Sequence, residues 1–148
     1  MRVSQKCQYA LRAVYELARH YRHGPVKIAD IAENQAIPVR FLEQILSQLR
    51  QGGFVESQRG NVGGYLLSRA PADLTVGEII CFVEGPLGFV KCTNNLGGEC
   101  PLNEACVFLP MWERARKAVE SVYDTTTFEN LIEEDARMHG NLALNYAI

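Results

Sequence analysis

The sequence predicts a mainly α-helical fold with one small β-hairpin. Apolar residues recur with helical spacing over residues 4–21, 26–35 and 38–51. Two short β-prone runs, 54–58 and 65–68, then flank a glycine-rich tip, which is typical of a hairpin. The order helix, short helix, turn, helix and hairpin is that of a winged helix-turn-helix. A second long helix is predicted from about Pro110.

The first three helices are predicted from their apolar spacing and their end signals. Ser4 can cap the first helix. In the second helix, Ile28 and Ile31 are expected to point inward. Pro38 suits the first turn of the third helix, and glycines at 52–53 end it. The residues expected in the core are Ala10, Ala13, Val14, Leu17, Ala18 and Tyr21 of the first helix, and Leu42, Ile45, Leu46 and Leu49 of the third.

The second half of the chain is predicted to hold three further helices. "TVGE" at 75–78 is a capping box, which opens a helix through about Val83 with Cys81 in the core. A helix from about Pro110 to Asp124 follows, and Thr126 with Glu129 can box a last helix through about Met138. We expect a helix-turn-helix domain over 1–84, a cysteine-bearing loop over 85–109, two helices over 110–138 and a loose tail over 139–148.

Charge is distributed unevenly along the chain. The whole chain of 148 residues has a net charge of −2, which by itself argues weakly against a nucleic-acid partner. Residues 1–70, however, hold ten Lys and Arg against five acids, whereas residues 71–148 hold five against twelve. A chain polarised in this way can present a positive face to a polyanion. Neither a secretory signal nor a membrane span is recognisable, so we expect a cytoplasmic location without a membrane partner.

The third helix and the hairpin tip carry side chains that suit double-stranded DNA. Arg can bond guanine and Gln can bond adenine in the major groove, while glycines allow close approach to phosphates and a lone Arg can enter a narrow minor groove. Glu43 is the exception, because it would repel phosphate if it faced outward. The candidate DNA-binding residues are Arg40, Gln44, Ser47 and Gln48 on the helix, and Arg59, Gly60, Asn61, Gly63 and Gly64 at the tip.

Three of the five cysteines, Cys92, Cys100 and Cys106, lie within fifteen residues in the pattern C-x7-C-x5-C. In a reducing compartment such a group favours a metal or redox role over a structural disulfide. Thiolates are the usual ligands of iron–sulfur clusters. A zinc site would need a fourth ligand, and the three histidines are not at a matching spacing. A disulfide redox switch is the third interpretation, and chance cysteines in a loop are the fourth.

No catalytic constellation is recognisable in the sequence. There is no Ser-His-Asp set, and "GNVGGY" lacks the Lys-Ser/Thr of a phosphate-binding P-loop. We therefore expect a binding protein, not an enzyme, without a small-molecule substrate.

Three stretches resemble a known family: "YALRAVYELA", "IADIAENQAIPVRFLEQILSQLRQGGFVESQRGNVGGYLLSR" and "LTVGEIICFVEG". The family comprises bacterial winged helix-turn-helix regulators of the IscR, NsrR, RirA and CymR types, and the resemblance spans about residues 1–137. It implies that Arg40, Gln44 and Gln48 lie on the recognition helix, that Arg59 is the wing arginine, and that the protein is a homodimer. The long helix would form the dimer interface, in agreement with its heptad-like apolar pattern, Phe108, Trp112, Ala115, Val119 and Val122.

The resemblance also implies a role for the cysteine loop, as in the iron–sulfur-binding branch of the family. Cys92, Cys100 and Cys106 match the three ligands of a 2Fe–2S or 4Fe–4S cluster. The IscR type takes its fourth ligand from a histidine at the position of Leu109, and other members use a position matching Gln8 or Arg12. Cys7, beside Gln8, is either a substitute fourth ligand or a core thiol. Other candidates for the fourth position are Glu99, Glu104, a small molecule or water.

The sequence thus predicts a homodimeric regulator of transcription whose binding to an operator is controlled by an iron–sulfur cluster. One alternative is a cluster-free regulator of the same fold that responds to thiol redox state or to cysteine metabolism. A further alternative is a cluster-carrier or interaction protein in which the helix-turn-helix is only a scaffold.

Overall fold

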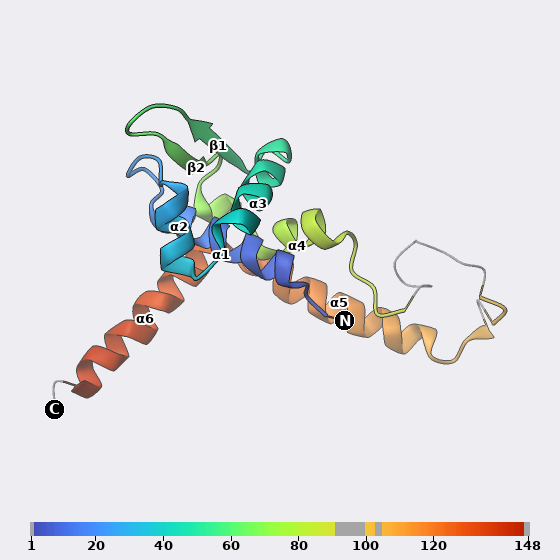
Figure 1. The fold of residues 1–148 in the computed structure, drawn as a ribbon. Coiled ribbons are helices and arrows are strands. Elements are labelled where there is room, and N and C mark those ends of the chain that lie inside the picture. Colours follow the sequence, from blue (N-terminus) through green and yellow to red (C-terminus); the bar gives the residue numbers. More distant parts are fainter. Residues whose placement is uncertain (1, 91–99, 103–104, 147–148) are drawn as a thin grey trace.

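The computed structural model describes residues 2–90, 100–102 and 105–146 of the chain, so that Cys92, Glu99 and Glu104 lie outside the described residues. Figure 1 shows the helices and the hairpin in chain order. The elements are α1 (Gln5–Arg19), α2 (Ile28–Gln35), α3 (Val39–Gln51), β1 (Val55–Gln58), β2 (Gly64–Leu67), the 3₁₀ turn η1 (Pro71–Asp73), α4 (Val76–Glu84), α5 (Leu109–Thr125) and α6 (Phe128–Tyr146). This mainly helical fold with one hairpin is the predicted one.

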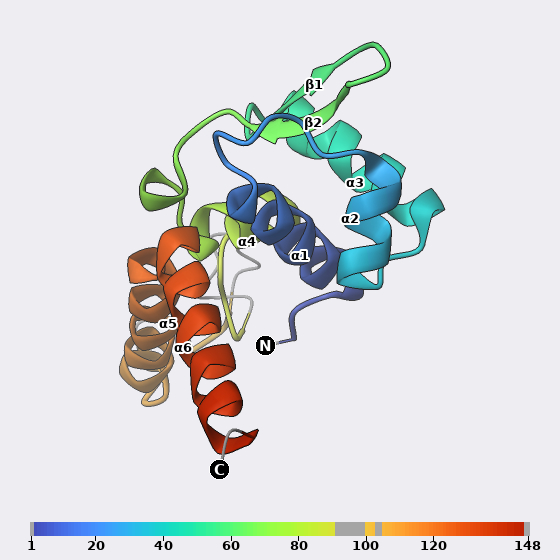
Figure 2. The same ribbon diagram turned by 90° about the vertical axis from the view of Figure 1, so that its left-hand side faces the viewer.

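Helix α1 is the centre of the fold. It packs against α2, α3, α4, α6 and β2, and Figure 2 shows α4 beside it and α2 and α3 on its other side. All of the predicted core residues of α1 and α3 are buried apart from Tyr21, which is half-buried against the same core. Burial of a side chain such as Leu42, whose exposure is 0%, contributes about 1.5–3 kcal/mol to stability.

Local side-chain caps begin the helices at the predicted places, with one exception. The Ser4 hydroxyl accepts a hydrogen bond from the Cys7 N–H at 3.1 Å, and Thr75 and Glu78 form both bonds of the predicted capping box. At α6, however, the box is made by Thr127 and Asn130. The predicted pairing of Thr126 with Glu129 is wrong, because the Thr126 hydroxyl instead donates to a carbonyl of the preceding helix, α5.

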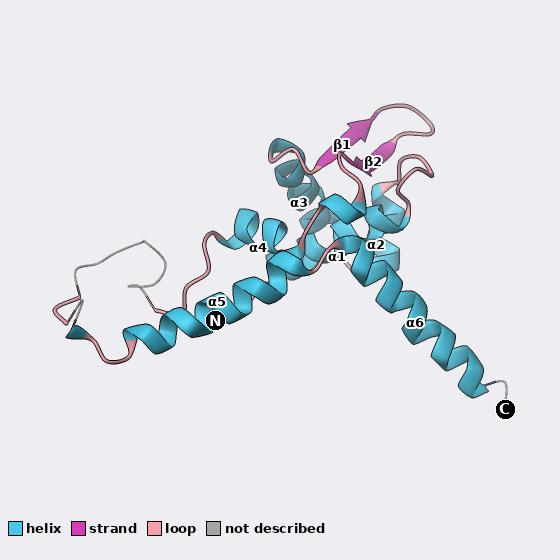
Figure 3. Ribbon diagram, turned by 180° about the vertical axis from the view of Figure 1, so that it is seen from behind, coloured by secondary structure: helices cyan, strands magenta, loops and turns pink. Residues whose placement is uncertain are grey.

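The hairpin is antiparallel and is joined to the helical body by a third short segment. Val55 pairs with Leu67 at its base, and Gln58 pairs with Gly64 near its tip. Figure 3 shows the two strands standing beyond the helices. Val26 and Tyr65 exchange two backbone hydrogen bonds of 2.8 Å. A Cβ at Gly64 would collide with the Val26 carbonyl, so this close approach requires glycine.

Two further expectations for the second half of the chain are wrong. Cys81 is exposed instead of buried, because α4 turns Ile79 and Ile80 inward. Helix α6 continues to Tyr146, eight residues past the predicted end at Met138, so the expected loose tail is helical up to that residue. Figure 1 shows α5 and α6 extending away from the helix-turn-helix body in different directions. None of the helices in the described ranges is long and apolar enough to cross a membrane.

Candidate nucleic-acid interface

The face of α3 opposite its buried residues is open to solvent. Arg40, Gln44 and Gln48 are exposed and Ser47 is half-exposed, as the helical period requires when the third helix buries one apolar stripe. The Arg40 guanidinium lies 4.6 Å from the centre of the Phe41 ring, which holds this cation beside the open face. The structure therefore presents all four predicted helix residues on one accessible surface.

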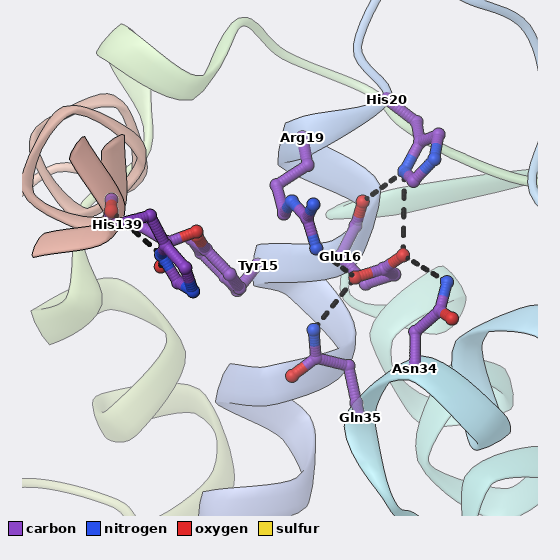
Figure 4. A network of polar contacts seen from close by, with 8 residues as sticks. Tyr15, Glu16, Arg19, His20, Asn34, Gln35 and His139 are labelled. Carbon is purple, nitrogen blue, oxygen red and sulfur yellow. Dashed lines mark hydrogen bonds and ion pairs between the residues drawn. The ribbon is translucent and has the colours of Figure 1, made fainter. Parts of the chain in front are cut away.

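A buried carboxylate that is absent from the predicted site residues joins α1 to the end of α2. Glu16 of α1 has an exposure of 0%. Its two oxygens accept hydrogen bonds from the amides of Asn34 at 2.8 Å and Gln35 at 2.7 Å, both at the end of α2. Figure 4 shows these two amides pointing at the carboxylate, with Arg19 and His20 on its other sides.

This network fixes the end of α2, from which the turn into α3 begins. A buried carboxylate is stable only when its oxygens are paired, and here the pairs come from two helices. The sequence signal was present, because Glu16 is a charged residue between the apolar positions Val14 and Leu17 of α1.

The hairpin tip is accessible and its backbone conformation requires glycine. Arg59, Gly60 and Asn61 are exposed, whereas Gly63 and Gly64 are half-buried. Gly60 has a φ of +112°, which residues with a side chain rarely adopt. Its carbonyl accepts a 3.0 Å hydrogen bond from the Gly63 N–H, which closes the turn.

A hydrogen bond joins strand β1 of the hairpin to α3, and a hollow lies between α3 and the tip. Arg50 at the end of α3 donates a 3.1 Å hydrogen bond to the Ser57 hydroxyl on β1. A hollow of about 710 Å³ separates α3 from the tip, and both Glu43 and Asn61 line it. Glu43 therefore faces outward, which is the orientation in which it would repel phosphate.

The two described loop cysteines have free thiols. Cys100 is exposed and Cys106 is half-buried. Cys106 lies three residues before α5, and its carbonyl accepts a 3.2 Å hydrogen bond from the N–H of Leu109, the first residue of that helix. Within the described ranges, no three or more His, Cys, Asp or Glu side chains form a group that could hold a metal ion. The third predicted ligand, Cys92, lies outside those ranges.

Cys7 has the surroundings of a core thiol. Its exposure is 0%, and burial, followed by the nearby charge of Glu84, raises its pKa to about 11. The thiol is therefore protonated at neutral pH when no metal is bound. Of the two interpretations that the sequence left open for Cys7, this burial is typical of the core thiol, and the ligand role stays a prediction.

The other family positions for a fourth ligand have polar partners within the chain. The Gln8 amide donates to the Val3 carbonyl at 3.2 Å. Arg12 donates to the Gln35 carbonyl at 3.5 Å and lies 5.9 Å from the centre of the Tyr9 ring.

Helix α5 exposes an apolar face. No residue of Leu109–Thr125 is buried. The helix packs against α4. Of the five predicted interface residues, Phe108 and Val122 are 59% and 61% exposed. Trp112, Ala115 and Val119 are half-buried. An apolar helix face of this kind is typical of a protein–protein contact.

Known proteins similar to this chain are transcriptional regulators. The model of the Rrf2 family, described as an iron-dependent transcriptional regulator, matches residues 3–134. The regulator IscR of Erwinia tasmaniensis is 36% identical over 132 residues, which are 89% of this chain and 79% of the relative. The regulator CymR of Bacillus subtilis is 38% identical over 131 residues, which are 88% of this chain and 89% of the relative.

Solved structures of both types share the fold. The structure of CymR, described as the global cysteine regulator of B. subtilis, has a TM-score of 0.78 at 35% identity, over 90% of this chain and 98% of that one. The structure of T. potens IscR has a TM-score of 0.72 at 34% identity, over 91% and 88%. The helix-turn-helix, the hairpin and the long helix are thus a shared framework. The chain belongs to the Rrf2 family of DNA-binding transcriptional regulators.

Proposed function

We propose that this protein is a homodimer whose binding to an operator is controlled by an iron–sulfur cluster, held by Cys92, Cys100 and Cys106. The observation that carries the proposal is the combination of an open α3 face with free thiols directly before α5. The open α3 face would serve as the surface for DNA, and the thiols would hold the sensor beside the helix proposed to join the two subunits.

Each subunit would place α3 in a major groove. Arg40 suits guanine, and Gln44 and Gln48 suit adenine, because their donors and acceptors match the edges of these bases. Arg59 at the hairpin tip would reach an adjacent minor groove, where a narrow width concentrates negative potential. A two-fold dimer would bind two half-sites whose spacing follows from its symmetry.

The dimer would form through the exposed apolar face of α5. Burial of Phe108 and Val122 against a second copy removes apolar area from water, and each such side chain contributes about 1.5–3 kcal/mol when fully buried. The half-buried Trp112 and Val119 lie on the same helical stripe, so a parallel or antiparallel pair of α5 helices would cover all of them.

The donor set of the loop fits an iron–sulfur cluster. Cys100 and Cys106 are accessible thiols with five residues between them, and thiolates are the usual ligands of 2Fe–2S and 4Fe–4S clusters. When bound, the cluster supplies a group that responds to iron, to oxidants or to nitric oxide. Binding or loss of the cluster would rearrange the 85–106 loop beside α5 and thereby change the spacing of the two DNA-binding units.

The test begins with protein purified without oxygen. Matched iron and sulfide contents with visible charge-transfer absorption should be found, and both should be lost in Cys100→Ala. Operator affinity of the loaded and cluster-free protein is then compared at one fixed salt concentration, because salt alone changes affinity strongly. Equal operator affinities of the two forms would contradict the proposal that a cluster controls binding.

A cluster-free thiol-redox regulator is a second candidate, which the similarity to CymR favours. In that case Cys100 and Cys106 would lose two protons and two electrons to a peroxide or a disulfide and form a disulfide bond. If the protein stays colourless after reconstitution and mass spectrometry finds this disulfide, the redox switch would be the supported mechanism and the cluster would not. Alanine at Arg59 separates both candidates from a scaffold without DNA binding, since it should weaken binding only in a regulator.

A further inference from the structure

We propose that a hollow between the start of α1 and α3 holds one sugar–phosphate strand of the bound duplex. Lys6, Tyr9 and Phe41 would then contact DNA in addition to the groove-facing side chains of α3. The inference deepens the DNA-binding function by naming a second helix of the domain as part of the interface.

The hollow is continuous with the open face of α3. Its volume is about 320 Å³, and it is lined from the side of α1 by Gln5, Lys6 and Tyr9. From the side of α3, its walls include Phe41 and the groove-facing pair Gln44 and Gln48. Any duplex that reaches Gln44 and Gln48 therefore comes against the first turns of α1.

The geometry of a major groove indicates that a sugar–phosphate strand would lie in this hollow. A helix in this groove has a sugar–phosphate strand on each side, because the groove is only about 12 Å wide. Helix α3 has a hollow on each side as well, one against the hairpin tip and one against α1. The two strands that border the groove would lie in these two hollows.

The charges around the hollow beside α1 suit a phosphate. Lys6 is the cation among the residues that line it, and they include no carboxylate. The first turn of α1 likewise holds no acidic residue. The hollow beside the hairpin differs, because Glu43 lines it together with Lys27. Electrostatic complementarity is therefore better on the side of α1.

An aromatic pair forms the apolar wall of the hollow. The rings of Tyr9 and Phe41 are stacked, with 6.3 Å between their centres. Arg12 lies 5.9 Å from the Tyr9 ring and Arg40 lies 4.6 Å from the Phe41 ring. The pair thus has a guanidinium at each end. Phe41 remains 40% exposed, which leaves a ring surface beside Lys6 for a deoxyribose.

The first experiment measures the salt dependence of binding. A duplex is selected from a random library by the full-length protein, and its affinity is measured between 50 and about 300 mM salt. The variant Lys6→Gln should lower the slope of log K against log salt by about 0.9 and weaken binding about fivefold at 0.15 M salt, as one lost phosphate contact requires. The control Lys117→Gln removes an exposed lysine of α5 and should change neither.

The second experiment tests the aromatic wall. Phe41→Leu should weaken binding several-fold with an unchanged circular dichroism spectrum. The matched control is Phe82→Leu, because Phe82 is 42% exposed and also packs on another ring, Phe54, at 5.0 Å. Its affinity should equal that of the wild type. Ethylation of one DNA phosphate should also weaken binding of the wild type, and ethylation of the same phosphate should not weaken binding of Lys6→Gln.

The outcomes separate this inference from the function on which it rests. If the wild type selects a duplex but Lys6→Gln keeps the wild-type slope and ethylation pattern, the inferred contact of α1 with DNA is contradicted. The proposed DNA-binding function is then unaffected. If Phe41→Leu and Phe82→Leu weaken binding equally, the aromatic wall is not a contact. If the wild type selects no duplex at all, both proposals fail.

Discussion

Glu84, the last residue of α4, accepts a 2.8 Å hydrogen bond at Oε1 from the backbone N–H of Ser4, the cap of α1. The cysteine-bearing loop begins at the next residue, Gly85, and Lys6 follows Ser4 by two positions. A hollow of about 200 Å³ lies where Arg2 and Val3 meet Pro86 and Leu87. The last residue of α4, which precedes the loop, therefore contacts the start of α1, and we expect this contact to join the proposed sensor loop to the proposed DNA-binding surface.

Removal of this contact should separate sensing from binding. In the wild type, loaded and cluster-free protein should differ in operator affinity by about fivefold or more, as allosteric coupling typically does. In Glu84→Ala the two affinities should approach one another, whereas Glu84→Gln retains an acceptor oxygen and should keep most of the difference. The control is Glu133→Ala on α6. An undiminished difference in Glu84→Ala would show that the signal takes another route.

The cysteines should differ widely in reactivity. Because the pKa of Cys7 is raised to about 11 by burial and by Glu84, only about one molecule in a thousand carries its thiolate at pH 8. Iodoacetamide at pH 8 should modify the exposed Cys81 and Cys100 first, and Cys7 only after unfolding. Peptide mass spectrometry over time gives the rates. Rapid labelling of Cys7 in folded protein would contradict its place in the core.

The contact of α1 with α6 should depend on pH through Asp135. The Tyr15 hydroxyl donates a hydrogen bond to the Asp135 carboxylate at 2.6 Å. This bond is the largest cause that lowers the pKa of Asp135, and the charge of His139 lowers it further. A lowered folded pKa adds stability above the unfolded value of about 3.9, and that stability is lost as the pH falls through the folded value.

Tyr15→Phe should therefore raise the pKa of Asp135 toward its ordinary value, and His139→Gln should raise it less. Carbon-detected NMR titration of the Asp135 carboxyl measures both changes. An unshifted titration in Tyr15→Phe would mean that the hydroxyl does not hold the carboxylate in solution.

The buried network of Glu16 should be needed for stability. Glu16→Gln places an amide donor against the amides of Asn34 and Gln35, so that one buried group loses its partner. The free energy of unfolding should fall by about 1–3 kcal/mol, measured by urea denaturation. Glu133→Gln, at an exposed site of α6, is the matched control and should be nearly neutral. A loss no greater than that of the control would exclude a structural role for the carboxylate.

The close approach of α4 to α5 should depend on Gly77. A Cβ at this position would collide with the Asp124 carboxylate, so Gly77→Ala should lower the free energy of unfolding by about 1–3 kcal/mol. Gly140→Ala is the control, because nothing surrounds that position in α6. There the substitution should stabilise the helix by about 0.5–1 kcal/mol. Thermal unfolding of both variants should show opposite shifts, and shifts in the same direction would contradict the contact.

Local patterns predicted much of the fold and of the surface of α3. The stripe of Leu42, Ile45, Leu46 and Leu49 is buried as its spacing requires, and Arg40 lies on the other face. The same reasoning was wrong for Cys81, because α4 is apolar around most of its circumference and the period does not reveal which side is buried. It also ended α6 too early, because the tail predicted over residues 139–148 is helical up to Tyr146.

The sequence by itself determined the order of the elements, the caps of α1 and α4 and the open face of α3, because these depend on contacts three or four residues apart. Only the tertiary structure decided the partners of Glu16, which are 18 and 19 residues away, and the contact of Glu84 with Ser4 across 80 residues. It also formed the hollow between α1 and α3. These features depend on how helices pack against one another, and helix packing brings together side chains whose separation along the chain follows no local period.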